Sequence, residues 1–270
     1  MHRIALAVEY NGSGFSGWQR QAAAGSRSDC PVATVQQEVE QALSQVAAHP
    51  VAVTCAGRTD AGVHATSQVV HFDCEIDRGE KAWTRGVNSL LPRSVRILWA
   101  RTVDQGFNAR FSATARRYHY VIYRRQQASA ILSGSVTHCP FVLDVGAMNE
   151  AAQSLLGEQD FTSFRAAGCQ SNTPFRNVHK VSVTEHGEFV LIDIEANAFL
   201  QHMVRNIAGS LMVIGRGQQS VQWVSELISA RDRSCAAMTA APDGLYLVQV
   251  LYPESLGLPV DVRPPPFFEY

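Results

Sequence analysis

Short stretches of alternating apolar and polar residues, typical of half-buried strands, are separated by segments whose apolar residues recur at helical spacing. In the first hundred residues this pattern predicts strands at 4–10, 51–55, 68–72 and 95–99, and helices at 34–48 and 80–91. Thr34 and Gln37 match a capping box at the start of the first helix. The order β-α-β-β-α-β is typical of a ferredoxin-like (RRM-like) unit, which has an antiparallel sheet with helices on one face.

The rest of the chain repeats this mixture of strands and helices. We expect strands at 118–123, 178–184, 190–196 and 245–251, and helices at 146–156, 203–214 and 221–230. The two middle strands are expected to form a hairpin around His186-Gly187. The predicted fold class is therefore α+β with two ferredoxin-like units, an N-terminal domain over residues 1–106 and a C-terminal domain over 107–270. Residues 259–270 contain four prolines and are expected to be a surface extension.

Composition indicates a globular protein whose charges are unevenly distributed. Of the 270 residues, 46% are hydrophobic and 17% are charged, which allows a packed core. The formal net charge is −1, yet residues 78–125 contain eleven basic and two acidic residues, a net charge of +9, so the remainder carries −10. Such a division within one chain is what binding of a polyanion through one face requires.

Cysteine and histidine spacing gives no sign of a metal or redox centre. The six cysteines, at positions 30, 55, 74, 139, 169 and 235, are too far apart for a paired CxxC motif. We therefore expect no metal site, and a reducing cytoplasmic location. No apolar stretch is long enough to cross a membrane.

The most informative motif lies in a polar break between the strands predicted at 51–55 and 68–72. There the sequence GRTDAGVHA at 57–65 places Asp60 between Gly57 and Gly62, with Arg58 two positions earlier. Glycines allow the chain to turn tightly and let a ligand approach the backbone. One interpretation is a hairpin in which Asp60 bonds the amides of its own turn. The other is a catalytic carboxylate.

With this motif in view, the chain closely resembles the tRNA pseudouridine synthase A (TruA) family. The resemblance runs nearly end to end and comprises seven blocks in the same order. Besides GRTDAGVH at 57–64 these are YNG at 10–12 through GWQR at 17–20, FNARFSA at 107–113, RRYHY at 116–120, DFTSF at 160–164, FLQHMVRN at 199–206 and GLYL at 244–247. A lone Thr-Asp-Ala-Gly would be weak evidence, whereas seven ordered blocks are strong evidence.

The resemblance implies isomerisation of uridine to pseudouridine at nucleotides 38, 39 and 40 of the tRNA anticodon stem-loop. Substrate and product contain the same atoms, so no cofactor, metal or group donor is needed. It also implies a homodimer, and a catalytic cleft between the two units. Shape rather than base identity should dominate recognition, because one enzyme serves neighbouring nucleotides.

The resemblance assigns roles to five residues. Asp60 is the nucleophile, attacking either the ribose or the uracil ring, and Arg205 keeps it ionised by an ion pair. Arg58 replaces the uridine that must leave the helix. Tyr118 packs against the target uracil, and Leu245 forms an apolar wall of the pocket. Structural alternatives are an Arg205 that reaches solvent past a helix end, a half-buried strand tyrosine, and a core leucine.

The resemblance also suggests tRNA contacts. The matching positions are Arg78, Phe107, Asn108, Ala109, Arg110, Phe111, Gly168, Cys169, Gln170, Ser171 and Asn172. Two positions depart from the family pattern, because Gln126 and Cys139 stand where further basic contacts are expected. The stretch 22–30 resembles an insertion before the first helix. These departures bear on peripheral tRNA affinity rather than on the central residues.

Two other functions remain to be weighed. A non-catalytic RNA-binding module would use exposed aromatic residues on a ferredoxin-like sheet and would not need Asp60. A hydrolase would use Asp60 as an acid or base, but glycosidases and aspartic proteases normally need a second carboxyl group. No second aspartate lies between glycines in the same way.

Overall fold

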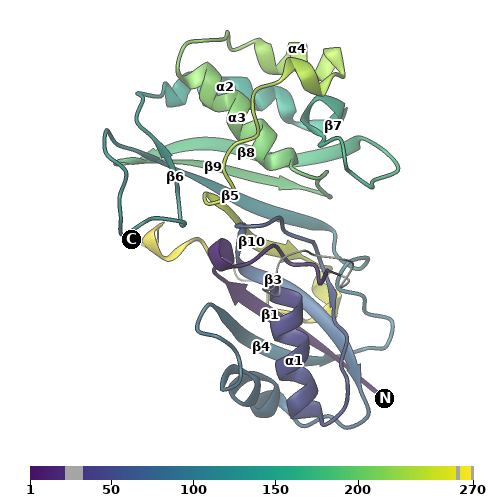
Figure 1. Cartoon of the computed structure of the whole chain (residues 1–270). Coiled ribbons are helices and arrows are strands. Elements are labelled where there is room, and N and C mark those ends of the chain that lie inside the picture. Colours follow the sequence, from purple (N-terminus) through teal and green to yellow (C-terminus); the bar gives the residue numbers. More distant parts are fainter. Residues whose placement is uncertain (22–32, 260–261, 269–270) are drawn as a thin grey trace. The chain divides into compact units, whose positions relative to one another are not determined.

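A computed structural model describes residues 1–21, 33–259 and 262–268, so the insertion-like stretch at 22–30 lies outside the described residues. The chain forms two compact units. In Figure 1, unit 1 contains the purple and blue segments with the yellow C-terminal segment, and unit 2 contains the teal and green segments. Unit 1 comprises Met1–Thr114 and Leu247–Tyr270, and unit 2 comprises Ala115–Tyr246. Each unit combines helices with mostly antiparallel strands, so the fold class is α+β.

Strand β1 (His2–Tyr10) lies inside the sheet of unit 1. It pairs antiparallel with β3 (His64–Cys74) and with β4 (Val95–Val103), which confirms the strands predicted at 4–10, 68–72 and 95–99. Strand β10 (Leu245–Leu251) follows β3 in the strand order. Both faces of β1 are covered, since Leu6 and Ala7 on opposite faces are fully buried. The sheet therefore forms part of the hydrophobic core.

Helix α1 (Val35–Ala47) confirms the predicted first helix, but its start differs from the expected capping box. Thr34 is the N-cap residue, yet its side chain makes no cap hydrogen bond, and its buried hydroxyl has no partner among the residues that the structure describes. The amides of Val35 and Gln36 instead donate to the carbonyl oxygens of Gly17 and Trp18 at 3.2 and 3.0 Å. The capping-box prediction was wrong because a distant backbone segment satisfies the first-turn amides that a side chain would otherwise bond.

The strand predicted at 51–55 is reduced to β2 (Thr54–Cys55), which pairs antiparallel with β3. The amide of Val51 donates to the hydroxyl of Ser44 at 2.9 Å, and the amide of Val53 donates to Glu40 Oε1 at 3.0 Å. Both acceptors lie on α1. Residues 51–53 are therefore bonded to the helix instead of to the sheet, although Val51 and Val53 are buried as a strand pattern predicts.

The second predicted helix of unit 1 contains the π-helix η2 (Ala82–Gly86). Its Trp83 is buried and meets Phe72 of β3 edge to face, with ring centroids 5.1 Å apart. This aromatic contact attaches the helix to the sheet.

In unit 2, β5 (Ala115–Arg124) pairs antiparallel with β9 (Phe189–Ala196). Strand β9 pairs antiparallel with β8 (Phe175–His186), which in turn pairs with β7 (Gly157–Asp160). The predicted hairpin is confirmed, and Gly187 in its turn has a φ of +61°, a left-handed conformation that glycine adopts readily.

Three helices accompany the sheet of unit 2, and Figure 1 shows them gathered on one side of β5, β8 and β9. They are α2 (Val145–Ala152), α3 (Met203–Gly215) and α4 (Trp223–Ala230), close to the predicted positions. The segment predicted as one helix at 146–156 ends as α2 and continues as a 3-10 turn, Gln153–Leu155. Asp144 caps α2 by accepting a hydrogen bond from the amide of Ala147 at 2.9 Å.

Strands β6 (Thr137–Cys139) and β7 were not predicted from the sequence. Strand β6 has three residues and pairs in parallel with β5. Strand β7 has the polar sequence GEQD and pairs with β8. Segments so short or so polar contain no detectable alternation.

The compact units divide the chain differently from the predicted domains at 1–106 and 107–270. Residues 107–114 belong to unit 1. So do Leu247–Tyr270, which include most of β10 and the segment after it. The amide of Thr114 bonds the carbonyl of Leu251 at 2.8 Å, and the Tyr252 hydroxyl donates to the carbonyl of Ala109 at 2.7 Å. These bonds hold the two segments together.

The C-terminal segment also differs from the expected surface extension, within the part that the structure describes. The Arg263 amide donates to the carbonyl of Val248 at 3.4 Å, and the Thr66 hydroxyl donates to the carbonyl of Arg263. Pro265 is buried. Residues 262–268 therefore pack against unit 1 instead of extending from it.

Candidate active site

The GRTDAGVH motif forms the catalytic-candidate loop, residues 57–64, which connects β2 to the start of β3. Thr59 is buried at its centre, whereas Asp60 is half-buried and Arg58 is exposed. The Thr59 carbonyl accepts a hydrogen bond from the Trp18 amide at 3.0 Å, and its hydroxyl lies 2.8 Å from the Tyr10 hydroxyl. The residue before Asp60 is therefore fixed by both its backbone and its side chain.

Glycines allow the segment at residues 12–17 to lie directly against this loop. A Cβ at Gly12 would lie 2.0 Å from the carbonyl oxygen of Val63, and one at Gly17 would lie 2.8 Å from that of Thr59. Gly62 uses the freedom expected from the sequence, with a φ of +80°. Gly57 is not among the glycines with a positive φ.

A buried amide side chain fixes Gly57 instead. Gln68 Nε2 donates to the Gly57 carbonyl at 2.5 Å, and Gln68 Oε1 accepts from the Gly57 amide at 3.4 Å. The Gln68 side chain is fully buried on β3. Gln68 therefore fixes the start of the loop next to Arg58, a role that the sequence pattern did not indicate.

His64 at the other end of the loop also holds the backbone. Its Nδ1 accepts the amide hydrogen of Gly12 at 3.0 Å, and the residue is only 2% exposed. An accepting Nδ1 carries no proton, so the ring is in the neutral form protonated on Nε2. This bond ties the end of the loop to the segment after β1.

The turn amides bear on the interpretation of Asp60 as a simple turn residue. The Gly62 amide donates to the carbonyl of Phe15 at 3.3 Å, and the Val63 amide donates to the Asp60 carbonyl at 3.2 Å. These two amides are satisfied without the carboxylate. The catalytic role of Asp60 stays a prediction.

The remaining predicted residues of unit 1 are either exposed themselves or lie next to exposed residues in the chain. Arg78 is exposed and donates from Nη2 to the carbonyl of Ala47 at the end of α1, at 3.0 Å. In the segment 107–111, Phe107 and Ala109 are buried, Asn108 is half-buried, and Arg110 and Phe111 are exposed. The Arg110 guanidinium lies 5.4 Å from the centre of the Phe111 ring.

The predicted catalytic and pocket residues of unit 2 lie on β5, α3 and β10. Tyr118 is 7% exposed and meets Phe199 edge to face at 5.0 Å. Leu245, the first residue of β10, is buried. Arg205 is half-buried in the first turn of α3, and its Nε donates to the carbonyl of Ala240 at 2.8 Å. Arg205 therefore does not simply reach solvent past a helix end.

The predicted tRNA-contacting loop at 168–172 is bonded by arginines close to it in sequence. Arg165 Nη2 donates to the carbonyls of Cys169 and Ser171 at 2.9 and 2.7 Å, and Arg176 Nη2 donates to the Ser171 hydroxyl at 2.6 Å. Gly168, Gln170 and Asn172 are exposed. Burial acts to raise the pKa of the Cys169 thiol, but hydrogen bonds to the sulfur and the charge of Arg165 outweigh it and lower the pKa below its usual value.

Several arginines of the basic segment at 78–125 are bonded to carboxylates. Arg101 pairs with Glu80 at 2.6 Å, and Arg117 makes a bidentate pair with Asp193 at 2.7 and 2.5 Å. Further pairs join Arg124 to Glu185 and Arg125 to Glu188. The segment also spans both units. Asp193, Glu185 and Glu188 lie outside the segment, so they partly neutralise its net charge of +9, which does not by itself define one basic face.

The two departures from the family pattern lie in different environments. Gln126 is exposed. Cys139 is fully buried, and its sulfur accepts a long hydrogen bond from Arg216 Nη2 at 3.9 Å. The Arg216 guanidinium lies over the Phe141 ring, 4.1 Å from its centre.

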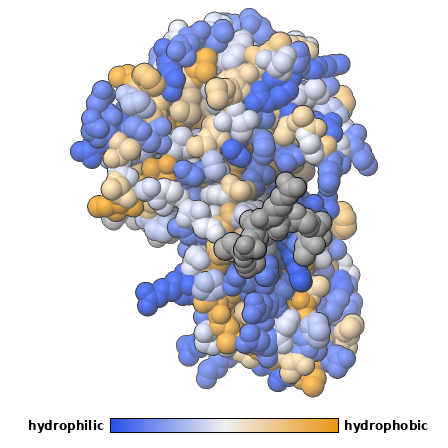
Figure 2. All heavy atoms as spheres, viewed as in Figure 1, coloured by the Kyte–Doolittle hydropathy of each residue, from blue (hydrophilic) through white to orange (hydrophobic). Residues whose placement is uncertain are grey.

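The described residues contain no group of three or more histidine, cysteine or acidic side chains that could hold a metal ion. No helix among them is both long and apolar enough to cross a membrane. On the face shown in Figure 2, hydrophilic residues predominate and hydrophobic ones form small separate groups.

Comparison with known proteins places these motifs in a family. A family model described as tRNA pseudouridine synthase matches residues 6–112 and 151–253. Proteins named tRNA pseudouridine synthase A from Shewanella amazonensis and Shewanella pealeana are 60% and 58% identical over 257 residues, 95% of each chain. That from Aeromonas hydrophila is 55% identical over 95% of this chain and 93% of its own.

Among solved structures, one titled "Crystal Structure of a Cbf5-Nop10-Gar1 Complex" matches 66% of this chain and 41% of that chain at 14% identity. Its TM-score of 0.31 is too low to show a shared fold. The family model and the sequence relatives both cover most of the chain, and the chain belongs to the tRNA pseudouridine synthase family.

Proposed function

We propose that this tRNA pseudouridine synthase acts on uridines at nucleotides 38, 39 and 40 of the anticodon stem-loop, with Asp60 as the nucleophile. The observation that carries the proposal is the support of the catalytic-candidate loop by Trp18, Tyr10, Gln68 and Gly12. A reacting carboxylate must be held at one position, because a displacement of about 1 Å can cost about 100-fold in rate.

The reaction breaks the bond between uracil N1 and ribose C1′ and forms a bond between uracil C5 and C1′. Uracil loses the proton on C5 and gains one on N1, so the atoms balance without a donor or an oxidant. Asp60 makes a covalent bond either to C1′ or to the uracil ring, and this bond breaks again before product release. The reaction as proposed needs neither a cofactor nor a metal.

Asp60 must be ionised to act as a nucleophile, and we assign Arg205 as the cation that keeps it so. Its half-buried position and the bond from its Nε to the Ala240 carbonyl support this role, because they fix the plane of the guanidinium. A fixed guanidinium offers donors in a fork that suits a carboxylate.

Arg58 is assigned the place of the uridine that leaves the helix. Removing a stacked base costs a few kcal/mol, and a planar cation that stacks on bases can offset this cost. The exposure of Arg58, next to a Gly57 that Gln68 holds rigidly, supports this role.

Tyr118 and Leu245 are assigned to the uracil pocket. Tyr118 contacts Phe199 through the edge of one ring, and such a ring offers a flat surface on which a base can stack. Leu245 is buried at the first position of β10, where it can exclude water from the base.

The exposed residues Arg78, Arg110 and Phe111, and the loop at 168–172, are assigned to tRNA binding. The arginine beside an aromatic ring at 110–111 suits RNA, which offers phosphates for the cation and bases for the ring. Arg58→Ala or Arg110→Ala is expected to weaken binding and to reduce the dependence of affinity on salt. An unchanged salt dependence in both variants would argue against these contacts.

Three broader features complete the proposal. The chain works in the cytoplasm as a homodimer. The units are ferredoxin-like, which in unit 1 is supported by the order of β4, β1 and β3 with β2 paired to β3. In unit 2, β9 lies between β5 and β8 as β3 lies between β1 and β2, and β7 is additional to that pattern.

The direct test is modification of a tRNA transcript that has uridine at nucleotides 38, 39 and 40, with purified protein in a buffer containing a chelator. Pseudouridine is mapped at each position. We expect conversion at these three nucleotides and not at uridines elsewhere in the transcript. Conversion confined to another part of the tRNA would reject the assigned target.

A further inference from the structure

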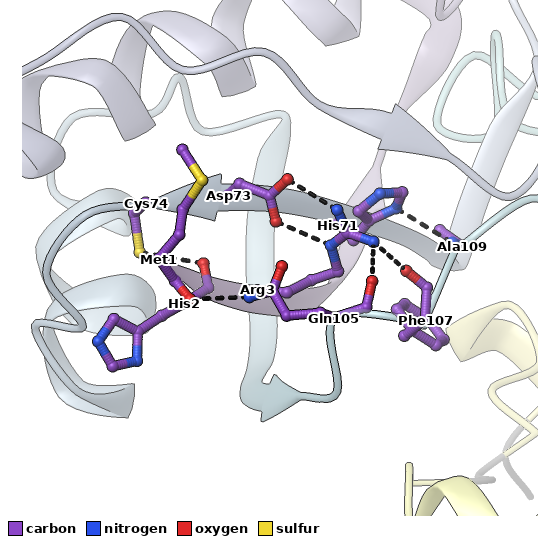
Figure 3. A network of polar contacts seen from close by, with 9 residues as sticks. All are labelled: Met1, His2, Arg3, His71, Asp73, Cys74, Gln105, Phe107 and Ala109. Carbon is purple, nitrogen blue, oxygen red and sulfur yellow. Dashed lines mark hydrogen bonds and ion pairs between the residues drawn. The ribbon is translucent and has the colours of Figure 1, made fainter.

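The segment after β4, residues 104–112, carries the exposed pair Arg110 and Phe111, and its backbone is bonded by side chains of the unit 1 sheet. Figure 3 shows this network, in which Arg3, His71 and Asp73 lie beside the carbonyls of Gln105 and Phe107 and the amide of Ala109. We call residues 104–112 the arginine loop.

Arg3 on β1 connects the loop to the sheet. Its Nε and Nη2 donate to the two carboxylate oxygens of Asp73 on β3, at 2.8 and 2.7 Å. Its Nη1 donates to the carbonyls of Gln105 and Phe107, the latter at 2.8 Å. The carboxylate fixes the orientation of the guanidinium, which then holds the first half of the loop.

His71 holds the second half. Its Nδ1 accepts the amide hydrogen of Ala109 at 3.1 Å, and its ring lies edge to face against Phe107, with centroids 5.9 Å apart. The Tyr252 hydroxyl donates to the carbonyl of Ala109 at 2.7 Å. Both backbone polar groups of Ala109 are therefore bonded to side chains of other elements.

The loop beyond Ala109 is closed by Asn108. Its side-chain oxygen accepts the amides of Arg110 and Phe111 at 3.0 and 3.1 Å, and its backbone carbonyl accepts the amide of Ser112 at 2.8 Å. The orientation of the exposed arginine and phenylalanine therefore depends on where Asn108 and Ala109 are held.

We propose that His71, together with the Arg3–Asp73 pair, is a positioning group that holds the arginine loop so that Arg110 and Phe111 engage tRNA, and that it does so only as a neutral imidazole. The inference rests on the proposed function, since it takes the arginine loop to contact tRNA. It adds a group that acts through the loop without touching RNA itself.

The neutral requirement follows from the bond to Ala109, because a protonated Nδ1 cannot accept a hydrogen. The charged groups that act on His71 are Arg3 from β1 and Asp73 from β3. Burial and then Arg3 lower the pKa of His71, against the opposing effect of Asp73. The bond is therefore present above the ordinary histidine pKa of about 6.5, and it is lost as the pH falls through the lowered pKa.

The test compares His71→Asn with His71→Leu. An asparagine oxygen can take the place of Nδ1 and does not titrate, whereas leucine removes the acceptor. At pH 7.5 we expect His71→Leu to raise the KM for tRNA about fivefold, the effect of one lost hydrogen bond, with kcat changed less than about twofold. His71→Asn should restore the KM. Between pH 7.5 and 5, the tRNA Kd of the wild type should rise more than that of His71→Asn.

A double-mutant cycle ties the effect to the loop. Arg110→Ala removes the contact that His71 positions, so adding His71→Leu to it should weaken binding by less than the product of the two single effects. Tyr252→Phe, which removes the other bond to Ala109, gives a milder variant if His71→Leu folds poorly. It should raise the KM in the same way.

Several results would overturn the inference: an unchanged KM in both His71→Leu and Tyr252→Phe, a fall in kcat alone, equal pH profiles of wild type and His71→Asn, or independent effects in the cycle. Binding is measured by filter retention of tRNA, which does not depend on catalysis. If the proposed target nucleotides are wrong, the wild type will form no pseudouridine at nucleotides 38, 39 and 40. The ratio of the tRNA Kd of each variant to that of the wild type would still decide the role of His71.

Discussion

The catalytic-candidate loop at 57–64 and the loop at 168–172 are both assigned to function, but they are held in different ways. The first is bonded by Tyr10, Trp18 and Gln68, from β1, from the segment before α1 and from β3. The second is bonded mainly by Arg165 and Arg176, within eight positions of it. A loop fixed by several elements keeps a reacting group in place, whereas a loop closed by its own neighbours can adjust to a partner without disturbing the sheet.

This difference predicts which substitution lowers stability and kcat the most. It is one that adds a methyl group where residues 12–17 contact the catalytic-candidate loop. Gly12→Ala would place a Cβ 2.0 Å from the Val63 carbonyl, so the backbone must move. We expect a loss of about 3 kcal/mol in the free energy of unfolding and a fall in kcat on the order of 100-fold, measured by denaturant titration and single-turnover assays.

The matched control is Gly14→Ala in the same 3-10 turn, where a Cβ meets nothing within 4 Å. It should leave stability and kcat nearly unchanged. Gly168→Ala in the other loop, with Gln201 Oε1 at 3.7 Å as its nearest neighbour, should affect only tRNA affinity. Equal losses of kcat in Gly12→Ala and Gly168→Ala would remove the distinction between the loops.

A smaller effect is expected from the buried amide that fixes Gly57. Gln68→Leu leaves the amide and carbonyl of Gly57 without their partner, which costs about 1–3 kcal/mol. Because Arg58 follows directly, we expect kcat to fall about tenfold, with a smaller change in KM. Ser171→Ala, which removes the acceptor of Arg176 Nη2, should instead change KM with kcat intact. Steady-state kinetics of the two variants would show whether this division holds.

The smallest perturbation is chemical labelling of one cysteine beside each loop. Burial raises the pKa of Cys55, on β2 before the catalytic-candidate loop, to about 11. The pKa of Cys169 is lowered instead. Because the thiolate is the reacting form, iodoacetamide at pH 7.5 should label Cys169 at least about tenfold faster than Cys55. Peptide mapping by mass spectrometry gives the order, and faster labelling of Cys55 would contradict the tight support of its loop.

Much of the fold follows from local patterns, because strand alternation and helical spacing reflect burial. They located β1, β4, β10 and α3, and they predicted the hairpin of β8 and β9, which the structure confirms. Patterns failed where a distant partner replaced a local one. Val51 and Val53 are buried as predicted, but their amides donate hydrogen bonds to Ser44 and Glu40 on α1 instead of to a neighbouring strand.

The candidate site shows the same limit. Two glycines around Asp60 indicated a tight loop, and Gly62 has the expected conformation. The supports could not be predicted, because Gly12 and Val63 are far apart in sequence and no local rule places a glycine against a distant carbonyl. The fully buried amide of Gln68 needs hydrogen-bond partners, but the strand pattern did not indicate that Gln68 holds the loop. Its burial became evident only from the fold.

The most direct test of the account is Asp60→Asn, assayed for tritium release from C5 of uridine-labelled tRNA alongside tRNA binding. The control is Glu150→Gln, an exposed carboxylate on α2. We predict that Asp60→Asn folds and binds tRNA like the wild type but releases no tritium, and that Glu150→Gln behaves as the wild type in both assays. Tritium release by Asp60→Asn at the wild-type rate would contradict a nucleophilic role for Asp60.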